Sequence, residues 1–95
     1  MKFAALIEYS QDQAKVESLR PAHRQYLRTL KEKKQIAATG PFTDGSGALI
    51  IYEASSKEEA DQLLMGDPFH ANGIFLHWQL RPWNPVMANR ELFPE

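Results

Sequence analysis

The segment RPAHRQYL, residues 20–27, places a histidine on the apolar side of a stretch with helical periodicity. At about 100° per residue, one stripe of this helix carries Leu19, His23, Tyr26, Leu27 and Leu30. A titratable ring that faces a protein core costs free energy unless a partner satisfies its nitrogens. His23 is therefore either a structural histidine bonded to a backbone carbonyl or water, or one half of an acid–base pair.

A carboxylate is the partner that would equip such an imidazole for chemistry. When it accepts a hydrogen bond from one ring nitrogen, it fixes the tautomer and leaves the other nitrogen as a base. One candidate is Asp67 in the loop GDPF, where the following Pro68 biases it to extended backbone. The alternative for Asp67 is a turn former, and sequence alone does not bring it near His23. Arg20 and Arg24 flank His23 and are cations suited to an anionic substrate.

Other catalytic chemistries find little support in the sequence. The chain has no cysteine, which excludes a thiolate metal site, a disulfide framework and a cysteine nucleophile. Its serines fall in predicted turns, linkers or caps, and no G-x-S-x-G motif occurs. The histidines at 23, 70 and 77 never show H-x-x-x-H spacing, so a set of two histidines and a carboxylate is a minor alternative. We therefore expect neither a metal nor another cofactor.

The pattern of apolar residues predicts one domain over residues 1–83 and a tail over 84–95. Predicted strands cover 2–9, 36–42, 48–54 and 74–83, and predicted helices cover 20–35 and 56–65. Residues 10–19 are expected to be a polar connection with room for one helical turn, and residues 66–73 a loop. Pro21 suits the first helical position. Ser56 with Glu59 indicates a capping box, and Gly66 a left-handed helix end.

This order, β-α-β-β-α-β, predicts an α+β fold of the ferredoxin-like type. Its four-stranded antiparallel sheet would carry both helices on one face. The strands at 2–9 and 48–54 are apolar on both sides, whereas a half-solvated sheet alternates between apolar and polar residues. The last strand is expected to place Phe75, His77, Gln79 and Arg81 on one face. We expect a second copy of the chain to cover the free face, giving a homodimer with sheets face to face.

Charge and hydropathy indicate which kinds of partner and which location the protein has. The net charge is −1, with a basic stretch at 20–34 and an acidic one at 53–67. No apolar run reaches the roughly 20 residues that cross a bilayer, and the N-terminus resembles a strand more than a signal peptide. The aromatic pattern is not that of an RNA-binding sheet. We expect a soluble, cytoplasmic protein with no nucleic-acid or membrane partner.

The motifs RPAHRQYL, TGPF and GDPF, followed by a strand with an aromatic-rich end, together resemble the YciI-like (YCII-related) family over roughly residues 1–82. The resemblance implies a ferredoxin-like fold, dimers of the dimeric α/β-barrel type and a histidine–aspartate site. Carried over, the histidine is His23 and the aspartate is Asp67, with Asp44 in FTDGSG as second candidate. Gly40 and Phe69 match positions that would line the pocket.

The family resemblance and the inward histidine together predict a small enzyme that performs acid–base chemistry on a small organic, possibly aromatic, compound. His23 and Asp67 would be catalytic, and Arg20 would hold an oxyanion or a substrate carboxylate. The reaction classes that fit are lyase, isomerase, dehalogenation and hydrolysis. The alternatives are a non-enzymatic metabolite-binding or accessory subunit and a cofactor-independent oxygenase on the same architecture.

Overall fold

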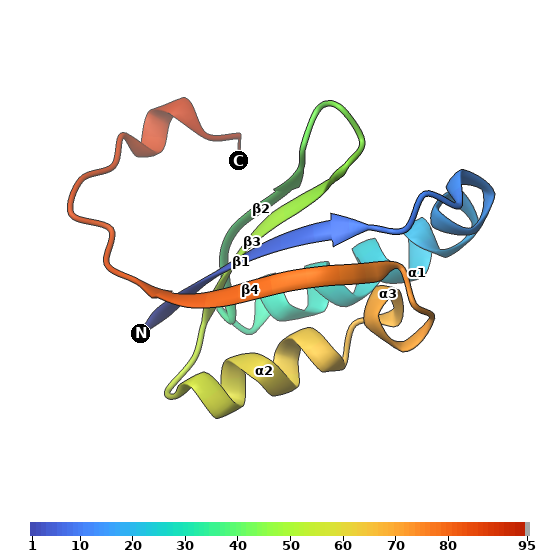
Figure 1. The fold of residues 1–95 in the computed structure, drawn as a ribbon. Helices are drawn as coiled ribbons and strands as arrows, with labels where there is room; N and C mark the ends of the chain where they lie inside the picture. Colours follow the sequence, from blue (N-terminus) through green and yellow to red (C-terminus); the bar gives the residue numbers. More distant parts are fainter. Residues whose placement is uncertain (95) are drawn as a thin grey trace.

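The computed structural model describes residues 1–94, and Glu95 lies outside the described residues. Four antiparallel strands form one sheet in the order β2-β3-β1-β4, and the helices pack on one side of it (Figure 1). The α+β, ferredoxin-like arrangement predicted from the sequence is confirmed. A third, one-turn helix is added where a loop was expected.

The elements follow one another along the chain as β1 (Lys2–Tyr9), α1 (Gln13–Glu32), β2 (Ile36–Pro41), β3 (Gly47–Glu53), α2 (Lys57–Met65), α3 (Pro68–Ala71) and β4 (Phe75–Trp83). A short 3-10 turn, η1 (Arg90–Leu92), lies in the segment after β4. Within residues 1–94, no helix is both long enough and apolar enough to cross a membrane.

Helix α1 begins seven residues earlier than the sequence predicted, so the expectation of a polar connection over 10–19 is wrong. Asp12 caps the helix by accepting a hydrogen bond from the backbone N–H of Lys15 at 3.1 Å. Val16, buried against the sheet, extends the apolar stripe toward this cap. Pro21 consequently lies inside the helix, where it removes one backbone donor. His23 thus occupies the middle of a 20-residue helix, not its first turn.

Helix α2 starts and ends as predicted, but the conformation of its C-cap residue differs from the expected one. The Ser56 side chain accepts from the backbone N–H of Glu59, while the Glu59 carboxylate bonds Ser55 and not Ser56. Gly66 was expected in a left-handed conformation, yet its φ is −77°. Its physical role is close approach, because an added Cβ would lie 2.6 Å from the hydroxyl of Tyr26. That hydroxyl donates to the carbonyl of Leu63 at 2.7 Å.

The core lies between the sheet and the helices. Its strand residues are Phe3, Ala5, Ile7, Tyr9, Ile36, Ala48, Ile50, Tyr52 and Phe75. The placement of Phe75 on the same face as His77 is wrong. A register shift in the β1–β4 pairing sets Phe75 opposite Tyr9, and it points into the core at 4% exposure.

The other face of the sheet carries no helix within residues 1–94 (Figure 1). Strand pairing places Leu6 opposite Leu49, and Ala4 opposite Ile51, at its centre. Leu6 is 42% exposed there. This face is apolar at its centre, as the sequence predicted.

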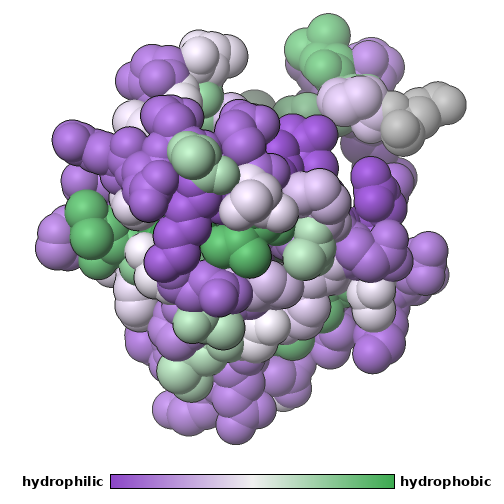
Figure 2. Space-filling view, turned by 90° about the vertical axis from the view of Figure 1, so that its right-hand side faces the viewer, coloured by the Kyte–Doolittle hydropathy of each residue, from purple (hydrophilic) through white to green (hydrophobic). Residues whose placement is uncertain are grey.

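Residues 84–94 run beyond the end of β4 and away from the helices (Figure 1). Their large apolar side chains, Val86, Met87, Leu92 and Phe93, are all exposed. At the side where β1 ends and α1 begins, hydrophilic side chains dominate and hydrophobic ones form separate spots (Figure 2). The apolar surface of the molecule is therefore scattered at that side.

The contact between Gly66 and Tyr26 predicts how α2 tolerates substitution. We expect Gly66→Ala to lower the free energy of unfolding by about 1–3 kcal/mol, because the new Cβ overlaps the Tyr26 hydroxyl. In a Tyr26→Phe background the same substitution should cost less, since the nearest ring carbon lies at 3.3 Å. Urea denaturation of the two single variants and the double variant measures this coupling. Gly40→Ala is the matched control, because nothing lies within 4 Å of its added Cβ; equal losses at both glycines would contradict the explanation.

Candidate functional site

His23 and Asp67 form a buried pair that joins α1 to the segment following α2. Nδ1 of His23 lies 2.8 Å from Oδ1 and 2.9 Å from Oδ2 of Asp67. The side chains are 7% and 0% exposed. An ionised carboxylate can only accept hydrogen bonds, so the proton of a neutral imidazole resides on Nδ1. This arrangement leaves Nε2 with a free lone pair.

The backbone of the segment after α2 aims Asp67 at the histidine. Asp67 has φ −71° and ψ 133°, the extended conformation expected before Pro68. It serves as N-cap of α3, where Oδ1 also accepts from the backbone N–H of Phe69 at 2.9 Å. Pro68 occupies the start of α3, where its missing N–H leaves no gap in the helix. The Asp67 carboxylate thus both caps α3 and accepts the hydrogen bond from His23.

A cluster of aromatic rings holds the imidazole in place. Phe69 stacks on His23 with ring centroids 3.9 Å apart and planes 5° from parallel. Phe75 meets the imidazole edge-on at 6.2 Å. Tyr9 meets Phe69 edge-on at 5.4 Å and stacks on Phe75 at 6.2 Å. The ring of His23 is therefore fixed by its partner on one side and by aromatic packing on its face.

The second nitrogen of His23 retains contact with solvent. Within residues 1–94, Nε2 has no hydrogen-bond partner, and the hydroxyl of Tyr52 is the one fully buried side-chain polar atom without a partner. Nε2 is consequently not sealed in the core. The imidazole combines a buried, charge-paired nitrogen with a second nitrogen that reaches the surface.

Tyr9 belongs to this site and was not singled out in the sequence. Burial, reinforced by the negative charge of Asp67, raises the pKa of Tyr9 to about 12, although Arg20 and Arg24 oppose the shift. The phenol therefore stays protonated near neutral pH and can donate a hydrogen bond. The period-2 pattern of β1, in which Phe3, Ala5 and Ile7 face inward, extends to Tyr9 and could have placed it on the core side.

The negative charge of Asp67 also acts on the other two tyrosines. Burial first, and Asp67 second, raises the pKa of Tyr26 and of Tyr52. All three phenols remain neutral donors around one buried carboxylate. Asp67 is thus the electrostatic centre of this end of the core.

The other site residues that the sequence suggested lie in three different places in the structure. Arg20 is half-buried and pairs with Glu17, with Nη1 2.7 Å from Oε1. Gly40 pairs with Leu49 on the edge strand β2, and its Cβ direction meets open space, so it does not join the histidine cluster. Asp44 is a turn residue: Oδ1 accepts from the backbone N–H of Ser46, and this hydrogen bonding lowers its pKa. Asp67, not Asp44, is the partner of His23.

Metal ligation finds no geometric support in residues 1–94, where no group of three or more histidine and carboxylate side chains converges. His70, which follows Asp67 by three residues, packs edge-on against Trp78 at 5.3 Å. It does not form a potential metal-binding group with His23 and Asp67.

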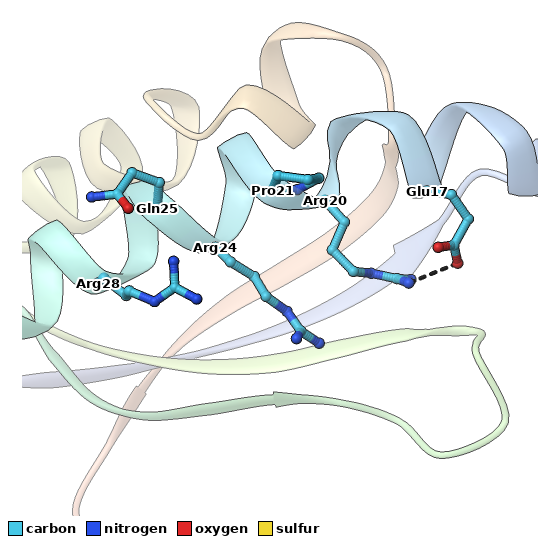
Figure 3. Close-up of a pocket in the computed structure, with 6 residues that line it drawn as sticks. All are labelled: Glu17, Arg20, Pro21, Arg24, Gln25 and Arg28. Atoms are coloured by element: carbon cyan, nitrogen blue, oxygen red, sulfur yellow. Dashed lines mark hydrogen bonds and ion pairs between the residues drawn. The ribbon is translucent and has the colours of Figure 1, made fainter.

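A hollow of about 480 Å³ runs along α1. It is lined by Glu17, Arg20, Pro21, Arg24, Gln25 and Arg28 (Figure 3). His23 and Asp67 are not among its lining residues. The hollow is therefore basic and lies on a different side of α1 from the imidazole.

The buried pair predicts a strong coupling between its members. We expect Asp67→Ala to lower the free energy of unfolding by about 2–4 kcal/mol, because the Nδ1–H of His23 and the backbone N–H of Phe69 lose their acceptor. In a His23→Ala background the same change should cost less, since one of the stranded donors is gone. A double-mutant cycle by urea denaturation measures the difference. Additive losses would contradict the pairing.

Comparison with known proteins places the chain among relatives of similar size. The model of the YCII-related domain matches residues 1–84. The uncharacterized protein YjpA of Bacillus subtilis is 37% identical over 63 residues, which cover 62% of this chain and 74% of YjpA. Protein YciI of Escherichia coli is 29% identical over 92 residues, which cover 82% of this chain and 94% of YciI.

A solved structure is similar in both fold and sequence. The 5-chloro-2-hydroxyhydroquinone dehydrochlorinase TftG of Burkholderia phenoliruptrix AC1100, in complex with 2,5-dihydroxybenzoquinone, superposes with a TM-score of 0.78. It is 26% identical, and the match covers 88% of this chain and 94% of TftG. Together with the match of the domain model over nearly the whole described chain, these similarities show that this protein belongs to the YCII-related family.

Proposed function

We propose that this protein is an enzyme that performs acid–base chemistry on a small hydroxylated aromatic compound. His23 acts as the base through Nε2, and Asp67 orients and stabilises it. The observation that carries the proposal is the buried contact of Nδ1 with both carboxylate oxygens, together with a second nitrogen that keeps solvent contact. A histidine retained only for packing does not need a buried charge as its partner.

The proposed chemistry begins with transfer of a proton to Nε2. As the imidazole becomes an imidazolium, its Nδ1–H stays bonded to the Asp67 carboxylate, whose negative charge stabilises the new positive charge. The substrate atom that loses its proton gains negative charge. The protonated phenol of Tyr9 and the guanidinium of Arg20 are the donors available to stabilise it.

The reaction of the structural neighbour supports this class of chemistry. TftG is named a dehydrochlorinase and holds a dihydroxybenzoquinone. Loss of hydrogen chloride from a chlorinated phenol needs a base to take the proton while chloride leaves with the carbon–chlorine bonding pair. The His23–Asp67 pair supplies such a base without an oxidant or a metal. The aromatic rings of Phe69 and Phe75 hold the imidazole of this pair in a fixed orientation.

The test of this proposal is turnover of 5-chloro-2-hydroxyhydroquinone, followed by release of chloride and by the absorbance of the quinone product. We expect His23→Gln to lower kcat/KM by at least about 100-fold, because the substrate proton loses its acceptor. Asp67→Asn should lower it as well, through the tautomer and orientation of the imidazole.

The matched control is His77→Gln, which removes an exposed histidine whose pairing with Glu8 places it on the opposite face of the sheet. A His23→Gln variant with full chloride release would remove the catalytic assignment. If the native protein is thermally stabilised by the compound but does not turn it over, the result favours the non-enzymatic metabolite-binding alternative.

We further propose that the protein is a homodimer of the dimeric α/β-barrel type, formed through the free face of the sheet. The central residues of this face are apolar, and Leu6 is exposed without a helix over it. An exposed sheet face of this kind favours association with a self-complementary copy. The exposed apolar side chains of residues 84–94 extend away from the helices and add to the surface available for such contacts (Figure 1).

The dimer proposal predicts that a charge at Leu6 separates the subunits. We expect light scattering to give the mass of a dimer for the native chain and that of a monomer for Leu6→Glu, because a buried unpaired carboxylate is costly. Met65→Glu is the control: it places the same charge at a residue that is 50% exposed at the end of α2. A native chain with the mass of a monomer would contradict the proposal.

A further inference from the structure

Three arginines line one side of α1 at four-residue intervals. Arg20, Arg24 and Arg28 border the hollow of about 480 Å³ described above. Figure 3 shows Arg20 and Arg24 projecting from the helix toward the β2–β3 hairpin, while the guanidinium of Arg28 is turned along the helix toward Arg24. Four residues advance an α-helix by about 6 Å, so neighbouring guanidinium groups can act on one ligand.

The positive charge of this row is largely uncompensated. Arg20 pairs with Glu17, whereas Arg24 and Arg28 have no carboxylate within 4 Å among residues 1–94. Like charges at four-residue spacing destabilise a helix by a few tenths of a kcal/mol per pair. The three arginines therefore do not stabilise the helix. An anion bound in the hollow would reduce the repulsion between their positive charges.

Tyr9 links the arginine row to the buried pair. The positive charges of Arg20 and Arg24 lower its pKa while the charge of Asp67 raises it, so the phenol lies within electrostatic reach of both. The ring of Tyr9 contacts Phe69, which stacks on His23. Arg20 and Arg24 also lie within one turn of His23 along α1, although on a different side of the helix.

Part of the helix-facing side of β2 is exposed. Thr39 and Pro41 of β2 pair with Ile50 and Ala48, which places them on the helix-facing side of the sheet. Both are nevertheless exposed, so α1 does not cover this end of β2.

We propose that Arg24, together with Arg20 and Arg28, forms a carboxylate-binding subsite, and that the substrate class is a hydroxylated aromatic acid. The guanidinium of Arg24 binds the carboxylate in a forked geometry, and the ring of the ligand lies toward Tyr9. This inference rests on the proposed function, because it assigns the anionic part of the substrate that His23 would deprotonate. Arg24 acts here as a residue that determines specificity, and it takes no proton.

The experiment compares two probes that differ in one carboxylate, 2,5-dihydroxybenzoate and 1,4-hydroquinone, by isothermal titration calorimetry. We expect the native chain to bind the acid more tightly. Arg24→Gln should weaken binding of the acid by about tenfold or more, the effect of losing one charge-assisted hydrogen bond, and leave hydroquinone unchanged. Arg24→Lys keeps the charge without the fork and should restore part of the loss.

The matched control is Lys33→Gln, which removes one positive charge at the C-terminal end of α1, outside the hollow. Equal effects of Arg24→Gln and Lys33→Gln would show a solvated basic face and overturn the inference. Loss of the native oligomeric mass in Arg24→Gln, with unchanged binding of both probes, would instead assign the row to contact with another copy and would also overturn it.

His23→Gln separates this inference from the proposed function. We expect this variant to keep the preference for the acid while losing turnover, because the carboxylate is held by the arginines. If Arg24→Gln weakens binding of the acid but His23→Gln retains full turnover, the subsite stands and the catalytic proposal fails. If both probes bind Arg24→Gln as they bind the native chain, the subsite fails whatever His23 does.

Discussion

A carboxylate with no exposed surface is the constraint on which the rest of this structure depends. Removing the charge of Asp67 from water is costly, and the cost is offset only if donors meet the carboxylate with good geometry. The donors are the Nδ1–H of His23 and the backbone N–H of Phe69. They fix the register of the segment after α2 against α1. The hydrogen bond from Nδ1 uses the edge of the imidazole, so the face of the ring can stack on the ring of Phe69.

The charge of Asp67 organises the polar end of an otherwise apolar core. Burial first, and the charge of Asp67 second, raises the pKa of Tyr9, Tyr26 and Tyr52, so all three phenols stay protonated near neutral pH. Arg20 and Arg24 act in the opposite sense on Tyr9 from the direction of the hollow. We propose that this distribution of charge orients an anionic aromatic ligand with its charged group toward the arginines and its ring toward Tyr9.

Two local interpretations of the sequence failed because a competing interaction was available. Pro21 indicates a helix start when neighbouring residues alone are considered, but Asp12 provides a cap farther upstream and Val16 continues the apolar stripe. Packing along a long helix outweighs one missing backbone donor. Gly66 indicates a left-handed helix end, yet its φ is −77°, and a side chain is excluded there because its Cβ would lie 2.6 Å from the hydroxyl of Tyr26. The glycine is needed because of a contact between two residues that are 40 positions apart in the chain.

The sequence by itself determined the order of strands and helices, the antiparallel ferredoxin-like sheet and the inward direction of His23, because these follow from the periodicity of apolar residues along each element. It also indicated Asp67 as a candidate, through its extended position before Pro68 and its place in a family motif. Only the tertiary structure decided that Asp67 and not Asp44 meets the histidine, that Gly40 lies apart from it, and that Tyr9 and Phe75 complete the cluster. Those relations join residues up to 66 positions apart, and a bulge between β1 and β4 shifts one of them to the other face. Periodicity reports the direction in which a side chain points, whereas the packing of helices on the sheet determines which side chain it meets.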